Sequence, residues 1–352
     1  MMLSAGNGFI MQSEKYSRDN AGQSLKKYIL LKQGELAYNH GASKAKQFGC
    51  CYELTEPEAR IPYVYHCFKI NDHEYTPFIA MALNNAKMDK QLKRVVSSSV
   101  RMDGLLNISF EDYMSVTLHL PSSTEQKHIA DFLKKIDERI AAQEKLLASL
   151  KKYKRGLLMH YFSDDKTQLW TQCSVSQIGK VITGSTPPTN DRSNYDGDLL
   201  FCAPGDVGEQ KYISSTEKRV SPKGFALGRP LPPNSVIVTC IGLIGKLGIA
   251  KTSMITNQQI NALVVSEGFD HEFIYYAFEN FFPEYRSKVS MQTLPILSKS
   301  EFEKLMIKVP DLDVQHKISS HLAAMDRRIE HTQQELNALI EHRRGIMQQL
   351  FI

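Results

Sequence analysis

The sequence predicts an α+β protein in which two mixed α/β domains are joined by two long helices that form an antiparallel coiled coil, with a pseudo-twofold internal repeat. Three observations predict this class. One segment of the chain occurs twice, both copies carry the apolar spacing of a long paired helix, and the other segments contain short β-branched runs broken by Gly and Pro. With 352 residues, 42% of them hydrophobic, the chain is long enough for two or three domains with cores of their own.

The repeat is offset by 189 positions, so that residues 121–162 align with residues 310–351 without a gap. The identical residues, numbered in the first copy, are Pro121, Gln126, Ile129, Leu133, Asp137, Arg139, Ile140, Leu147, Leu150, Arg155, Gly156 and Phe162. Upstream, Ser109 meets Ser298 in the same register. The repeat therefore predicts a globular domain over residues 1–120, a helix over 121–162, a second globular domain over 163–309 and a second helix over 310–352.

Within both repeated segments the apolar residues alternate at spacings of four and three for more than four heptads, which is typical of two helices wound on each other. The apolar seam consists of Ile129, Leu133, Ile136, Ile140, Leu147, Leu150, Leu157, Ile318, Leu322, Met325, Ile329, Leu336, Leu339 and Ile346. Polar residues interrupt the seam at matched places, Gln143 with Thr332 and Lys154 with Arg343. Because an isolated polar seam residue specifies pairing, we interpret these four as register devices; incidental surface variation is the alternative.

Each predicted helix begins just after a proline, Pro121 or Pro310, where the missing N–H does no harm. Ser122, Ser123 or Thr124 can cap the first helix. At the standard rise, a helix of roughly 40 residues is about 60 Å long.

The globular segments contain candidate strands at residues 235–239 and 261–265 and candidate helices at residues 77–93 and 272–285. An Asp-His-Glu run precedes each of these helices, at Asp72 and at Asp270. The runs can be imagined as acid–base or metal clusters, but their position favours helix N-caps. The glycines between residues 242 and 248 do not fit a phosphate-binding loop, because the required first Gly and the Ser or Thr after the Lys are missing, and a connection between strands accounts for them better.

No motif for a nucleophile, a metal centre or a dinucleotide cofactor occurs in a usable context, so we assign no catalytic, cofactor-binding or metal-binding residue. None of the six cysteines has the Cys-x-x-Cys spacing of a zinc site, which favours reduced structural thiols. The chain lacks both a membrane span and a signal peptide, so that a cytoplasmic protein is expected.

The chain has 43 Lys and Arg against 38 Asp and Glu, a formal net charge of +5 that permits a polyanionic partner without requiring one. Basic residues cluster in both globular segments. Two basic domains held apart by a rigid spacer could bind two short sites on one DNA duplex, with phosphate contacts positioning each domain and base contacts giving the sequence choice. The candidate DNA contacts are Lys218, Arg219 and Lys246 in the second segment and Lys93 and Arg94 in the first.

This plan resembles the DNA-specificity (S) subunit of type I restriction-modification systems over essentially the whole chain. The helix motif from Pro121 to Ile140, present in two copies, is the most specific part of the resemblance. The other matching motifs are Lys154-Arg155-Gly156-Leu157 ending at Phe162, Thr183-Gly184-Ser185-Thr186-Pro187, Pro204-Gly205-Asp206-Val207 and Asn257-Gln258-Gln259-Ile260-Asn261.

The resemblance implies a non-catalytic subunit in a complex of DNA methylation and host defence. Two target recognition domains would each bind one half of a split sequence in double-stranded DNA, and the paired helices would set the gap. It also implies two modification methyltransferase subunits, which flip out and methylate adenine, and restriction/translocase subunits as partners. S-adenosylmethionine, ATP and Mg are then expected only in those partners.

The first globular segment departs from this pattern, because it has no counterpart of Trp170 or of the segment around Thr183. A truncated or rearranged, partly functional specificity subunit is therefore one alternative, and a sequence that starts at an internal Met is another. A structural coiled-coil adaptor without DNA specificity and an enzyme that acts alone are the alternatives from other classes.

Overall fold

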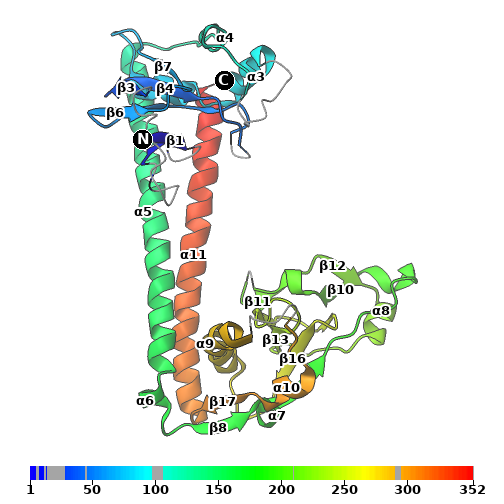
Figure 1. The fold of residues 1–352 in the computed structure, drawn as a ribbon. Coiled ribbons are helices and arrows are strands. Elements are labelled where there is room, and N and C mark those ends of the chain that lie inside the picture. Colours follow the sequence, from blue (N-terminus) through cyan, green and yellow to red (C-terminus); the bar gives the residue numbers. More distant parts are fainter. Residues whose placement is uncertain are drawn as a thin grey trace. The chain divides into compact units, whose positions relative to one another are not determined.

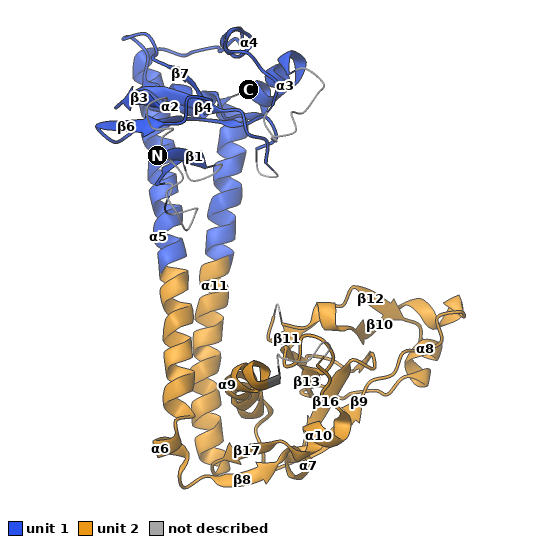
Figure 2. Ribbon diagram, viewed as in Figure 1, with its two compact units in different colours: residues 1–145, 334–352 blue, residues 146–333 orange. Residues whose placement is uncertain are grey.

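The computed structural model describes residues 1–4, 8–11, 13, 28–43, 46–96, 106–208, 210–289 and 295–351. The chain divides into two compact units: unit 1 is formed by residues 1–145 and 334–352, and unit 2 by residues 146–333 (Figure 2). The division falls inside both long helices, so each unit contains part of each helix. The expected division into two globular domains and two helices that follow one another along the chain therefore stays a prediction. In the described part of the chain, no helix combines the length and hydropathy that crossing a membrane requires.

The two long helices are α5 (Ser123–Tyr161) and α11 (Leu312–Leu350), and they run antiparallel. In unit 1, Asp137 and Gln143 of α5 bond Arg343 and Glu335 of α11, so the partner numbers fall as the α5 numbers rise. In unit 2 the same order holds, as shown by the contact of Lys154 with Asp326 and that of Tyr161 with His321. The fold class predicted from the repeat is therefore confirmed.

Each of the seam residues is buried or half-buried. Leu133 and Leu322, which the repeat aligns, are fully buried. At the start of α5, Ser122 is the capping residue, since its Oγ accepts a hydrogen bond from the N–H of Glu125 at 3.4 Å. None of the matched polar seam residues is exposed, which agrees with their assignment as pairing devices.

Unit 2 is built around a five-stranded sheet with helices beside it (Figure 1). The order in this sheet is β11 (Tyr212–Ile213), β14 (Leu247–Ala250), β13 (Val236–Thr239), β16 (Ile260–Val265) and β9 (Gly179–Thr183). A three-stranded sheet has the order β12 (Lys218–Val220), β10 (Tyr195–Cys202) and β15 (Met254–Thr256), and β17 (Met306–Val309) pairs with β8 (Thr171–Ser174). The helices are α6 (Asp164–Thr167), α7 (Val175–Ile178), α8 (Pro222–Leu227), α9 (His271–Val289) and α10 (Lys299–Lys304).

The predicted strands of the second globular segment are confirmed, and β13 shows why that run is apolar throughout. Val236 and Val238 belong to the core beneath α9, whereas Ile237 belongs to the core cluster on the opposite side. Successive residues of a strand point to opposite faces, so a strand covered on both faces needs apolar residues at every position.

Residues 240–246, with Gly242 and Gly245, form the connection between β13 and β14 as predicted, and Gly248 lies in β14. Gly245 has a φ of +78°, and a Cβ there would lie 2.5 Å from the Phe282 ring, so a glycine is required on two counts. Thr239 holds the loop through its Oγ, which accepts from the N–H of Lys246 at 3.0 Å. These contacts fix the conformation of the loop.

Unit 1 has smaller sheets. A three-stranded sheet has the order β5 (Cys50–Glu53), β4 (Leu36–Asn39) and β7 (His66–Phe68). The pairs are β3 (Ile29–Lys32) with β6 (Glu58–Ile61) and β1 (Met2–Ser4) with β2 (Gly8–Ile10). The short helices are α2 (Thr76–Ala82), α3 (Ala86–Val95) and α4 (Phe110–Met114). Ser109 and Ser298, which the repeat aligns, cap α4 and α10 respectively.

Two predictions for this unit are wrong in detail. The helix predicted at residues 77–93 is broken, because the Asn84 side chain leaves the helical pattern to bond both the N–H and the carbonyl of Cys51 on β5. Asn85 then caps a new helix, accepting from the N–H of Met88 at 2.9 Å. Asp72 is not the N-cap of α2: the helix begins after Tyr75, and Asp72 is an exposed partner of Lys69.

Candidate nucleic-acid interface

Lys218 and Arg219 lie side by side on β12, the edge strand of the three-stranded sheet in unit 2, and both are exposed. The strand is anchored by Val220, which is fully buried and pairs with β10. Neither basic side chain forms an ion pair within the described residues. By contrast, the nearby Lys223 is 2.8 Å from a carboxylate oxygen of Asp191. Lys218 and Arg219 therefore present uncompensated positive charge to solvent, the property that a phosphate-binding surface needs.

Lys246 lies elsewhere in unit 2, in the loop between β13 and β14, and is half-buried. Its aliphatic stem runs beside Gly208, where a Cβ would be 3.4 Å from Lys246 Cδ. Within the described residues, no hydrogen bond or ion pair joins Lys246 to Lys218 or Arg219.

The two candidates in unit 1, Lys93 and Arg94, are exposed in the last turn of α3. Cations in that position interact favourably with the negative end of the helix dipole, so the helix itself gives a structural reason for them. A role of these five residues in DNA binding stays a prediction.

The structure joins two motifs whose relation the sequence did not show, residues 183–187 and residues 257–261. The N–H groups of Gly184 and Ser185 donate to the carbonyls of Ile260 and Thr256, at 3.0 and 2.9 Å. The exposed Thr186 donates from Oγ1 to Oε1 of the exposed Gln258 at 2.6 Å. The approach is so close that a Cβ on Gly184 would lie 2.1 Å from the Asn257 carbonyl oxygen. This polar surface, Thr186 with Gln258, was missed because its halves lie some seventy residues apart.

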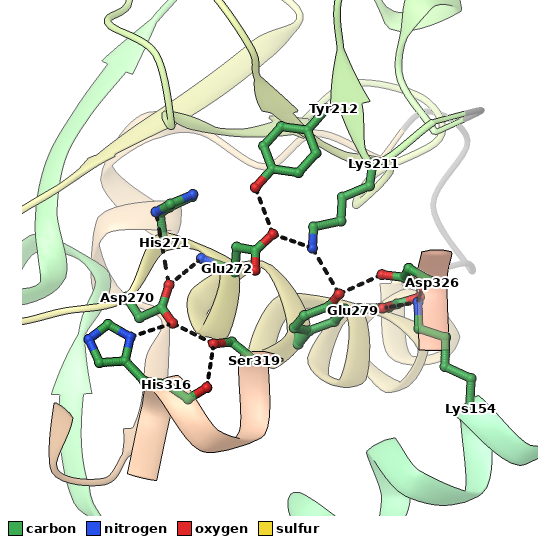
Figure 3. A network of polar contacts seen from close by, with 11 residues as sticks. Lys154, Lys211, Tyr212, Asp270, His271, Glu272, Glu279, His316, Ser319 and Asp326 are labelled. Carbon is green, nitrogen blue, oxygen red and sulfur yellow. Dashed lines mark hydrogen bonds and ion pairs between the residues drawn. The ribbon is translucent and has the colours of Figure 1, made fainter. Parts of the chain in front are cut away.

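A network of charged and hydroxyl groups connects the globular part of unit 2 with the two long helices (Figure 3). At its centre Lys154 of α5, with a side chain only 12% exposed, lies 2.8 Å from Glu279 of α9 and 2.7 Å from Asp326 of α11. Burial opposes the charged form of Lys154, but the two carboxylates outweigh it and raise the pKa of the ammonium group. Lys154 thus stays protonated and holds three helices together.

Tyr276 extends the network. Its hydroxyl donates to Asp326 and accepts from Lys211 Nζ at 2.8 Å. Burial, together with Asp326, raises the pKa of Tyr276, which keeps the donor protonated. Lys211 also forms an ion pair with Glu272, which accepts a hydrogen bond from Tyr212 at 2.6 Å.

Asp270 caps α9 as predicted, since it accepts from the N–H of Glu272 at 2.9 Å. It also accepts from Ser319 Oγ and contacts His316 Nδ1 at 3.1 Å, both on α11 (Figure 3). Burial favours its neutral form, but these hydrogen bonds prevail and lower the pKa of Asp270. The arrangement joins a helix end to the coiled coil. No cluster of three or more potential metal ligands occurs in the part of the chain that the structure describes.

The same junction contacts occur in both units. Gln126 donates to the Pro121 carbonyl at 2.9 Å and accepts from the Tyr75 N–H at 3.0 Å. Gln315, its counterpart at +189, donates to the Pro310 carbonyl at 2.8 Å and accepts from the Asp270 N–H at 2.9 Å.

Two further kinds of contact also occur at matched positions in both units. Phe351 packs on Phe78 in unit 1, and Phe162, the counterpart of Phe351, packs on Phe273 in unit 2, with ring centroids 5.2 and 5.6 Å apart. The pair of Arg343 with Asp137 likewise corresponds to the pair of Lys154 with Asp326. The matched glutamines and phenylalanines thus join each globular part to the helices, whereas the two matched ion pairs join the helices to each other.

Comparison with known proteins identifies the family. A family model described as "Type I restriction modification DNA specificity domain" matches residues 23–152 and 168–342. The chain belongs to this family. The two matched regions show that the type I specificity chain carries the family's domain twice, in agreement with the internal repeat.

Curated relatives agree with the assignment. The MjaIX specificity subunit of Methanocaldococcus jannaschii is 30% identical over 178 residues, which cover 49% of this chain and 41% of that protein. The HindI specificity subunit of Haemophilus influenzae is 29% identical over 108 residues, 30% of this chain and 24% of that protein. The matches thus span less than half the length of these relatives.

Two solved structures share the fold. The type I restriction-modification S subunit from M. genitalium has a TM-score of 0.59 at 15% identity and is matched over 93% of this chain and 85% of its own. A chain from a study of complex assembly and conformational transition of the type I R-M system has a TM-score of 0.59 at 16% identity, over 92% and 82%.

Proposed function

We propose that this chain is the subunit that gives a type I restriction-modification complex its DNA specificity, by binding double-stranded DNA at a two-part site. Each unit would bind one part. The observation that carries the proposal is the duplicated junction: Gln126 and Gln315 make the same two hydrogen bonds in units 1 and 2, so the chain presents two α+β bodies built on one plan. Family membership supports DNA as the ligand of both.

In unit 2, Lys218 and Arg219 would contact phosphates, since they are exposed and without a carboxylate partner in the described structure. Lys93 and Arg94 would do so in unit 1, and Lys246 is a further candidate. Thr186 and Gln258 are the side-chain types that bond base edges, and Gly184 beside them lets their two loops pack closely together. We propose this surface for sequence choice.

The chain would leave bond-making and bond-breaking to its partners. Two modification methyltransferase subunits holding S-adenosylmethionine would methylate the bound DNA, and restriction/translocase subunits using ATP and Mg would complete the complex. The paired helices would set the spacing of the two half-sites. An insertion of seven residues into both helices preserves the heptad phase, so it should widen the gap in the methylated sequence or abolish methylation.

The test is DNA binding by the chain assembled with its methyltransferase subunits, with the target first identified by methylome sequencing of cells with and without the gene. Replacing Lys218 and Arg219 together by Ala should weaken binding and reduce the slope of log K against log salt by about 2, because each phosphate contact contributes about 0.9. Lys223→Ala is the matched control, since its ammonium is already paired with Asp191. If the affinity for DNA does not fall as salt rises, the chain makes no phosphate contacts. That result would contradict the proposal and favour a structural adaptor without DNA specificity.

A further inference from the structure

Arg229, which follows α8 in unit 2, is an exposed arginine whose side chain makes a hydrogen bond to the main chain. Its Nη1 donates to the carbonyl oxygen of Thr183, the last residue of β9, at 2.9 Å. Within the part of the chain that the structure describes, Arg229 forms no ion pair with a carboxylate. A carbonyl carries no net charge, so this contact orients the guanidinium group without neutralising it.

The backbone on both sides of Arg229 is anchored. Gly228 is packed so tightly on β15 that a Cβ there would lie 2.7 Å from Cδ1 of Ile255. Leu231 is fully buried and pairs with β15 through an isolated β-bridge. Between them, Pro230 favours an extended backbone at the residue before it, because the proline ring crowds that residue. Arg229 therefore loses less conformational freedom on binding a ligand than an arginine in an open loop does.

The carbonyl that holds Arg229 is fixed as well. Thr183 pairs with Asn261 in the register of β9 and β16, and its Oγ1 donates to Oδ1 of Asn261 at 2.6 Å. Asn261 is buried, and its Nδ2 donates to the carbonyl oxygen of Leu297 at 3.1 Å. A series of hydrogen bonds thus connects the core of unit 2 with the exposed guanidinium group.

The contacts of Arg229 place it beside the polar surface formed by Thr186 and Gln258. Thr183, which holds Arg229, is three positions before Thr186, and Thr186 donates to Gln258 at 2.6 Å. Gln258 follows the end of β15 by two residues, and residues 228–231 lie antiparallel along this same strand. The three segments therefore converge at one end of β15, where Arg229 adds positive charge and N–H donors to a surface that offers a hydroxyl and an amide.

A guanidinium group held in this way has a preferred ligand. Its five N–H donors form a planar fork, and while Nη1 bonds Thr183, Nε and Nη2 remain as a parallel pair of donors. Guanine is the base whose edge in the major groove offers two adjacent acceptors, N7 and O6, so such a pair can bind it through two hydrogen bonds. Lys218 and Arg219 make no comparable side-chain bond among the described residues, which suits contacts with phosphates of any sequence.

We propose that Arg229 is a specificity-determining residue that contacts, through Nε and Nη2, a guanine in the half-site bound by unit 2. The inference rests on the proposed function, because it requires unit 2 to bind one half of a split DNA site. It goes further by naming a base that this half-site contains and the side chain that selects it.

The experiment measures DNA binding by the full chain assembled with its methyltransferase subunits, on the target identified from the methylome. Each guanine of the target is replaced in turn by 7-deazaguanine, which lacks the N7 acceptor. At the guanine that Arg229 contacts, we expect this replacement to weaken binding about fivefold, because one hydrogen bond is lost. Inosine at the same position keeps N7 and O6 and should leave the affinity unchanged.

The variant Arg229→Ala should weaken binding of the unmodified target about 5- to 150-fold. It should also remove the effect of 7-deazaguanine at that one position, because the donor is already gone. Arg219→Ala is the matched control, since Arg219 is an exposed arginine of the same unit that the proposed function assigns to phosphate. It should lower the slope of log K against log salt by about 0.9 and retain the effect of 7-deazaguanine at every position.

Circular dichroism checks that both variants fold, and the measurements with 7-deazaguanine on the native chain need no variant. If no guanine responds to 7-deazaguanine, or if Arg229→Ala retains the response at every guanine, the inference is overturned. Equal weakening of the target and of unrelated DNA by Arg229→Ala would also overturn it, since a phosphate contact gives that result. In these cases the native complex keeps its salt-dependent binding and the proposed function stands. Absence of salt-dependent binding by the native complex would instead contradict the proposed function, and the inference with it.

Discussion

Replacing Lys154 by Met tests whether burial decides the strength of the ion pairs that Lys154 and its counterpart Arg343 form on the long helices. Lys154→Met keeps the apolar stem and removes the charge between Glu279 and Asp326, whose side chains are 31% and 22% exposed. Loss of one partner of a buried ion pair costs 3–5 kcal/mol, and the partial exposure of both carboxylates lowers our expectation to about 2–3 kcal/mol. At 1.4 kcal/mol per factor of ten, this is roughly a 30- to 150-fold change in the unfolding equilibrium of unit 2.

The repeat supplies a matched control. Arg343, the counterpart of Lys154, is 32% exposed and its partner Asp137 is 44% exposed, so Arg343→Met should cost only about 0.2–1 kcal/mol. Urea unfolding measures the loss of unfolding free energy in both variants. The single tryptophan, Trp170, packs against Phe162 and Phe273 and reports on unit 2, while far-UV circular dichroism reports on the whole chain. If the two variants shift the unfolding midpoint equally, burial is not what distinguishes the pairs, and the reasoning is refuted.

Three further predictions concern single sites. Gly184→Ala should reduce DNA affinity and destabilise unit 2 by about 2–3 kcal/mol in urea unfolding, because the new Cβ meets the Asn257 carbonyl at 2.1 Å; an unchanged midpoint would contradict the close approach. Asp270 has a lowered pKa in the folded chain, so its stabilising contribution is present above its unfolded value of about 3.9 and is lost as the pH falls below that value. Asp270→Asn should therefore flatten the acid side of a plot of unfolding free energy against pH, and a parallel downward shift would argue against the linkage. Burial raises the pKa of Cys51 and Cys202 to about 12, so iodoacetamide at pH 8 should label these thiols only after unfolding, as mass spectrometry can show.

The long helices and the buried strands could be predicted from the sequence because their patterns are local. The four-three spacing specifies a paired helix wherever it occurs, and the run around Val236 needs only a sheet covered on both faces. The matched polar positions also carried real information, since Lys154 and Arg343 each bond an aspartate that the repeat places in both helices. That Glu279 is a second partner of Lys154 follows only from the packing of α9, which no periodicity reveals.

The failures have a common physical cause, contacts between residues distant in sequence. Asn84 breaks a helix because it bonds a strand 33 residues away. An Asp-His-Glu run occurs at both Asp72 and Asp270, but the residue whose N–H Gln126 bonds at the helix start is Tyr75, three positions after Asp72. Thr186 and Gln258 meet only when two loops fold together, so their shared surface was not among the predicted sites.

The buried glutamines at the two junctions have a consequence for the exchange of whole modules. Gln126 and Gln315 each accept from a main-chain N–H, so this bond does not depend on whether the donating residue is a tyrosine or an aspartate. Gln126 also bonds the Glu74 carboxylate, and in unit 2 the side chains of Asp270 and Glu279 bond residues of the long helices. A globular domain exchanged by recombination would therefore keep the main-chain bond whatever its sequence, whereas the side-chain bonds would require matching residues.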